Sequence, residues 1–99
     1  MKQYRLQAEP AVELDVESAF EWYETEEPGL GFEFVEQVRA AYQLVAQNPF
    51  AFQNLRSSIR RALTRRFPYA VYFSVENDTV LILAVLHCAR DPAEWQRRV

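Results

Sequence analysis

The first half of the chain repeats apolar residues at intervals of three and four, which is the spacing of one face of an α-helix. A first helix is predicted from Pro10, a residue favoured in the first helical turn, to the break at residues 26–29. Its apolar stripe consists of Val12, Val16, Ala19, Phe20 and Tyr23. A second helix is predicted from about Leu30 to Gln47, where Asn48 and Pro49 end it. Its apolar stripe consists of Phe34, Val38, Ala41, Tyr42 and Val45. Because the break is short, we expect an antiparallel helical hairpin.

Strand patterns flank these two helices. Residues 4–8 alternate apolar and polar side chains, and strands are also predicted over residues 59–65, 69–75 and 80–86. A loop is predicted over residues 49–58, a hairpin turn over 76–78, and a final helical turn over 92–98. The order β-α-α-β-β-β predicts an α+β fold, with the helical hairpin packed on a curved, mainly antiparallel sheet. We expect residues 1–99 to form one domain.

The two halves of the chain carry opposite charge. Residues 1–50 hold 3 basic and 10 acidic side chains, whereas residues 51–99 hold 8 basic and 4 acidic ones. Nearly every cation is an arginine, whose guanidinium suits bidentate contacts with phosphate or carboxylate. The asymmetry indicates that the second half faces an anion or an acidic protein partner.

Several classes of protein are disfavoured by composition. The longest apolar run, residues 80–86, is far shorter than the roughly 20 residues that span a bilayer. No signal-peptide pattern opens the sequence, so we expect a cytoplasmic protein without membrane association. Cys88 is the only cysteine and His87 the only histidine, which excludes an intrachain disulfide and argues against a structural zinc site. We expect no metal and no cofactor.

Short motifs are spread over essentially the whole chain. They are Glu21-Trp22-Tyr23-Glu24, Pro28-Gly29-Leu30-Gly31-Phe32-Glu33-Phe34, Asn48-Pro49, Arg60-Arg61-Ala62-Leu63, Arg66-Phe67-Pro68-Tyr69, Val85-Leu86-His87 and Arg90-Asp91-Pro92. In this order and spacing they resemble the RelE/ParE superfamily of toxins from type II toxin–antitoxin systems. The resemblance implies a toxin that a co-encoded antitoxin neutralises by wrapping around it. It also implies that the toxin contacts operator DNA only through the antitoxin.

The resemblance leaves two toxic activities open. RelE-like members cut messenger RNA on the ribosome without a metal, using basic side chains and a tyrosine near the end of the sheet. Such cleavage needs an activated 2′-hydroxyl, cations around the phosphate and a proton donor. For that activity the catalytic candidates are Arg60, Arg61, Arg90 and His87. The C-terminal tyrosine has no counterpart, since Trp95 is the only aromatic residue there, and the assisting lysines are also missing.

ParE-like members poison DNA gyrase by binding and need no catalytic groups. We prefer this activity because the nuclease groups are incomplete, and because residues 28–31 and the Leu86-His87 and Arg90-Asp91-Pro92 motifs resemble ParE-type chains. A third hypothesis is an inactive relative that is retained as an antitoxin-binding module.

Structural roles compete with each of these assignments. The partner-binding candidates are Arg61, Arg65, Arg66 and Trp95. Strand alternation places Arg61 and Arg65 on one face of the sheet and Arg60 on the other, so they cannot all touch one ligand without a bulge or turn. These arginines can equally form a solvated face, and Trp95 can equally cover the edge of the sheet. We expect Trp22 and Tyr23 to lie in the core between helices and sheet.

Overall fold

The computed structural model describes residues 3–98 and confirms the predicted α+β fold, with one more strand after the helices than was predicted. Its elements are β1 (Arg5–Ala8), α1 (Pro10–Glu26), α2 (Leu30–Gln47), the 3-10 turn η1 (Pro49–Ala51), β2 (Gln53–Arg56), β3 (Ile59–Leu63), β4 (Tyr69–Glu76), β5 (Thr79–His87) and α3 (Ala93–Gln96). Within residues 3–98, no helix is both long enough and apolar enough to cross a membrane.

The segment predicted as a loop, residues 49–58, instead contains η1 and a strand, β2. Exposed Gln53 and Asn54 gave this segment no apolar pattern, because β2 is a short edge strand with one paired side. It pairs antiparallel with β3 through a tight turn, in which Ser57 adopts a φ of 52°. The strand predicted over residues 59–65 ends earlier, at Leu63, because the next residues form the turn into β4.

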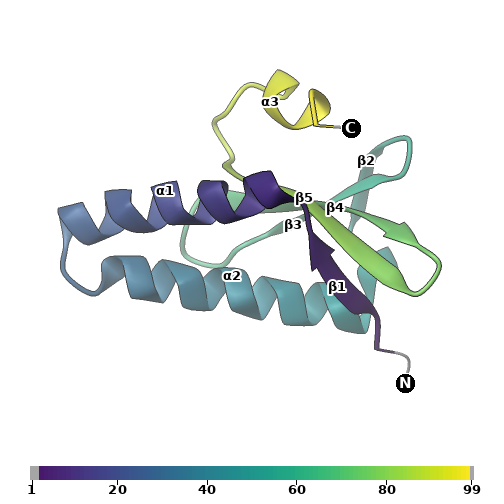
Figure 1. The fold of residues 1–99 in the computed structure, drawn as a ribbon, viewed down its shortest axis with the longest axis horizontal. Coiled ribbons are helices and arrows are strands. Elements are labelled where there is room, and N and C mark those ends of the chain that lie inside the picture. The colour runs from purple at the N-terminus through teal and green to yellow at the C-terminus, as the bar shows by residue number, and fades with distance from the viewer. Residues whose placement is uncertain (1–2, 99) are drawn as a thin grey trace.

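The five strands form one mixed sheet in the order β1-β5-β4-β3-β2. Neighbouring strands are antiparallel except for β1, which pairs parallel to β5 with Arg5 opposite Thr79 and Ala8 opposite Ile82. A parallel pair needs a crossover, and the α1–α2 hairpin forms the first part of that connection. Figure 1 shows α1 and α2 running side by side in opposite directions, with β1 leading into α1.

One face of the sheet packs against the helical hairpin. The apolar stripes predicted for both helices meet buried side chains of this face, including Phe73, Val80 and Ile82. Phe34 of α2 is fully buried and lies against the rings of Tyr23, Phe67 and Tyr69. This aromatic cluster fixes the position of α1 over the start of β4.

The opposite face of the sheet has its own, smaller core. Ile59, Tyr72 and Leu86 are buried there, and the last helix, α3, lies over them (Figure 1). The indole of Trp95 stacks on the ring of Tyr72, with 5.3 Å between ring centroids and an interplanar angle of 15°. The short C-terminal helix predicted over residues 92–98 therefore closes the second face.

Candidate functional site

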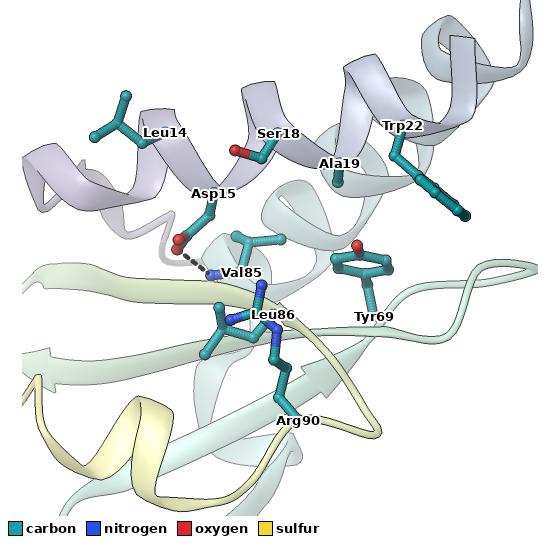
Figure 2. A pocket seen from close by; sticks show the side chains of 9 residues that line it. All are labelled: Leu14, Asp15, Ser18, Ala19, Trp22, Tyr69, Val85, Leu86 and Arg90. Carbon is teal, nitrogen blue, oxygen red and sulfur yellow. Dashed lines mark hydrogen bonds between the residues drawn. The ribbon is translucent and has the colours of Figure 1, made fainter. Parts of the chain in front are cut away.

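A polar cleft lies between α1 and the adjoining ends of β4 and β5 (Figure 2). It has a volume of about 290 Å³, and its walls come from α1 on one side and from the sheet and the loop after β5 on the other. The lining residues are Leu14, Asp15, Ser18, Ala19, Trp22, Tyr69, Val85, Leu86 and Arg90. The cleft brings polar and aromatic side chains of α1 together with Tyr69 and Arg90, and only Arg90 among them was a site residue predicted from the sequence.

Asp15 closes one end of the cleft and is fully engaged. Its carboxylate accepts a hydrogen bond from the Val85 amide at 3.0 Å and a bidentate ion pair from Arg98 at 2.6 and 2.8 Å. Arg98 also donates to the Leu83 carbonyl at 3.3 Å. The hydrogen bond and charge of Asp15 raise the pKa of Arg98. Together the pair covers the free edge of β5 beyond its contact with β1, and both carboxylate oxygens of Asp15 accept hydrogen bonds.

Tyr69, the first residue of β4, directs its hydroxyl toward α1 in Figure 2. Burial, followed by the neighbouring Tyr23, raises the pKa of the Tyr69 hydroxyl, although the cation of Arg90 acts in the opposite direction. The group therefore stays protonated at neutral pH and can donate a hydrogen bond or a proton.

His87 and Arg90, two of the predicted site residues, lie beside Tyr69. His87 pairs with Tyr69 across β4 and β5, and their ring centroids are 5.3 Å apart. The Ala89 amide donates to His87 Nδ1 at 2.9 Å, which fixes the orientation of the imidazole. Arg90 rises from the following loop toward α1 (Figure 2). Its contact with Glu94 is long, at 3.8 Å, whereas Arg97 holds Glu94 at 3.0 Å.

Trp22 stands on the α1 wall of the cleft and is 61% exposed. The prediction that it fills the helix–sheet core is therefore wrong, whereas Tyr23 beside it packs in the aromatic cluster. The helical period explains the difference, because consecutive helical residues are about 100° apart and only one of the two can face the sheet.

Arg60 and Arg61 do not join this cleft. Arg60 lies opposite Phe73 on β4, four residues beyond Tyr69, which corresponds to about 13 Å along the strand. It donates to the Phe52 carbonyl at 2.7 Å and lies over the Phe50 ring. Arg61 points to the opposite face, as its alternation predicted, and donates to Gln53 Oε1 at 3.1 Å.

The other partner-binding candidates are also dispersed. Arg65 and Arg66 are exposed in the turn between β3 and β4, where Arg66 has a φ of 73° and forms an ion pair with Glu33 of α2. Trp95 is only 8% exposed, and its indole packs on the sheet as described above. Of the six arginines and aromatic residues proposed from the sequence, only Arg90 lines the cleft.

Sequence reasoning did not select Tyr69, Ser18, Asp15 or Trp22 for this site. Tyr69 belongs to a strand rich in aromatic and β-branched residues, which is the signature of a core strand. The available signal was its position next to the turn, where a strand end exposes its first side chain. Among residues 3–98, no three histidine, cysteine or acidic side chains lie close enough together to hold a metal ion.

Comparison with known proteins gives two results. The family model described as "ParE toxin of type II toxin-antitoxin system, parDE" matches residues 6–92. Among solved structures, one described as "Chromosomal ParDE TA system from P. aeruginosa" superposes with a TM-score of 0.76 at 15% identity. The match covers 86% of this chain and 96% of that chain, and it shows a shared fold. No sequence among curated proteins matches significantly.

Proposed function

Because the chain belongs to the family of ParE toxins from type II toxin–antitoxin systems, we propose that it arrests growth by binding and poisoning DNA gyrase. The family implies a cognate ParD antitoxin as the partner that neutralises it. The observation that supports gyrase over RNA is the placement of the arginines. Arg60 and Arg61 lie on opposite faces of the sheet, and neither reaches the cleft that Arg90 lines.

A toxin that acts by binding has no need of convergent cations, whereas phosphate cleavage needs several of them around one phosphorus. Within residues 3–98, Arg90 is the only arginine that lines the cleft. Arg65 and Arg66 are exposed in the β3–β4 turn, where Arg66 also pairs with Glu33, and they can contact a protein partner there. This distribution suits a broad interface better than a compact active centre.

The test is a supercoiling and DNA-cleavage assay with purified gyrase, in which the toxin is titrated with and without its antitoxin. We expect inhibition accompanied by trapped cleaved DNA, and reversal by the antitoxin. Unaffected supercoiling at a stoichiometric excess of a folded, growth-arresting toxin would exclude gyrase as the target.

One observation favours the second candidate, ribosome-dependent cleavage of messenger RNA. Tyr69 is a protonated tyrosine near the end of the sheet, next to His87 and Arg90, and so supplies the proton donor that the C-terminal segment lacks. Primer extension on translated messages distinguishes the candidates, because the nuclease leaves codon-phased cuts that Tyr69→Phe removes. A third candidate, an inactive antitoxin-binding module, requires tight antitoxin binding without any growth defect.

A further inference from the structure

We propose that the cleft between α1 and the ends of β4 and β5 binds a peptide segment of the target protein, in which one carboxylate adjoins an aromatic or aliphatic side chain. This inference rests on the proposed function, since it assigns the cleft to gyrase and not to the antitoxin. It follows from the charge of the cleft, from its exposed apolar wall and from a comparison with a second groove.

The cleft presents a single available positive charge. Asp15 and Arg98 form a bidentate pair and cancel each other. Glu94 lies closer to Arg97 than to Arg90, so the Arg90 guanidinium keeps most of its hydrogen-bonding capacity. A planar guanidinium in the same cleft as the Tyr69 hydroxyl can hold a carboxylate through two parallel hydrogen bonds.

The α1 wall of the cleft supplies apolar contact area. Trp22 is 61% exposed and Leu14 is 65% exposed, and both line the same cleft. Exposed tryptophans next to arginines are the residue types that dominate binding energy at protein interfaces. A ligand with an aromatic or aliphatic group beside its carboxylate would cover these two side chains while it pairs with Arg90.

A nucleic acid fits the surroundings less well than a peptide. Among the described residues that line the cleft, Arg90 is the one cation, and residues 1–50, which include α1, have a balance of 3 basic against 10 acidic groups. A chain of phosphates that extended beyond Arg90 would meet repulsion instead of the basic stripe that such ligands require. A single carboxylate avoids this penalty.

A second groove suits the antitoxin better. It lies on the opposite flank of α1, has a volume of about 460 Å³, and is lined mostly by apolar side chains such as Val16, Phe20, Val35 and Tyr42. Stable, long-lived complexes bury more apolar surface than transient ones. We therefore assign the smaller, polar cleft to the transient target contact.

The experiment compares two cleft variants, Arg90→Gln and Trp22→Ala, with two matched surface variants, Arg39→Gln and Leu44→Ala. Arg39 and Leu44 are exposed on α2 and do not line the cleft. For each variant we measure the concentration that inhibits gyrase supercoiling by half and the dissociation constant for the antitoxin. We expect each cleft variant to need about tenfold more toxin, while antitoxin affinity and both surface variants change less than about twofold.

The outcomes separate the inference from the proposed function. If the unmodified toxin inhibits gyrase and the cleft variants inhibit it equally well, the cleft assignment is overturned and the gyrase activity stands. If the cleft variants bind the antitoxin more weakly but still inhibit gyrase normally, the cleft binds the antitoxin and the inference is overturned. If the unmodified toxin does not inhibit gyrase, both proposals fall.

A direct measurement addresses the chemistry of the ligand. The Trp22 indole N–H signal is followed by NMR while the toxin is titrated with acetyl-Glu-Phe-amide, with acetyl-Gln-Phe-amide as the matched neutral peptide. We expect the acidic peptide to shift the Trp22 signal in the unmodified toxin but not in Arg90→Gln, and the neutral peptide to have little effect. Equal shifts from both peptides, or stronger shifts from a single-stranded oligonucleotide, would contradict a carboxylate-bearing ligand.

Discussion

At the residue scale, Gly31 determines how closely the two long helices approach. A Cβ built at this position would lie 2.6 Å from the Phe20 carbonyl oxygen, and the Gly31 amide donates to Glu24 Oε1 at 2.9 Å. We expect Gly31→Ala to lower the free energy of unfolding by about 1–3 kcal/mol, because the backbone of α1 cannot move away cheaply. Urea denaturation measures the effect, with Gln43→Ala on the exposed surface of α2 as the control. Equal stability of the two variants would show that the hairpin can widen.

The partly buried residue Tyr42 makes the stability of the folded protein depend on pH. Burial, followed by the charge of Asp15, raises the pKa of Tyr42 to about 12 in the folded protein. In the unfolded chain the Tyr42 hydroxyl loses its proton near pH 10. The contribution of Tyr42 to the free energy of unfolding is therefore complete below about pH 10 and is lost as the pH rises toward about 12. We expect Tyr42→Phe to make stability fall less steeply across this window. Urea unfolding at a series of alkaline pH values tests this, and parallel curves for the two proteins would contradict it.

At the element scale, two anchors hold α3 and the residues after it on the body of the protein. Trp95 stacks on Tyr72, and Arg98 pairs with Asp15, whose side chain is only 8% exposed. We expect Trp95→Ala to cost about 3 kcal/mol through the lost core contact, and Arg98→Ala about 2–3 kcal/mol through the carboxylate left unpaired.

The two anchors of α3 depend on each other, because one short segment carries both. We therefore expect the double variant to lose about 1 kcal/mol less than the sum of the single losses, because loss of one anchor already loosens the segment that carries the other. A double-mutant cycle from urea denaturation measures this coupling. Arg97→Ala, with its side chain 67% exposed, serves as the control and is expected to change stability by less than about 0.5 kcal/mol. Strict additivity would mean that the segment is held at two independent points.

At the scale of the whole molecule, the basic half of the chain is spread over two faces instead of being focused on one site. We therefore expect the double variant Arg60→Ala, Arg61→Ala to keep at least about half of the growth-arresting activity, at matched expression and with its fold checked by circular dichroism. Loss of the Arg60 contact with the Phe52 carbonyl is expected to cost about 1 kcal/mol of stability. Complete loss of growth arrest in a folded double variant would instead favour cleavage of messenger RNA that depends on Arg60 and Arg61.

Apart from β2, the element order was predictable because strong local signals marked it. Pro10 begins α1, the break at residues 27–29 separates the helices, and Asn77 with a φ of 56° occupies the predicted hairpin turn. The alternation in β3 also correctly separated Arg60 from Arg61. Each of these features is determined by residues close to it in the sequence, and such local patterns can be read without the structure.

The cleft was less predictable, because distant segments build it. Trp22 and Tyr69 are far apart in the sequence, and only the packing of α1 over the sheet brings them to one cavity. The Asp15–Arg98 pair joins the two ends of the chain, and no local pattern marks it. β2 was not predicted for a different reason, because a polar edge strand lacks the alternation of apolar and polar residues that identifies half-buried strands.

The parallel pairing of β1 with β5 has a consequence for synthesis on the ribosome. β1 is made first, yet its partner in the sheet is the last strand to be made, and Arg98 must follow before Asp15 is paired. The emerging chain therefore carries an uncovered helical hairpin until nearly all of it has left the ribosome. Neither the cleft nor the completed sheet exists in a partial chain, so we expect the chain to bind a partner at the cleft only after its synthesis is complete.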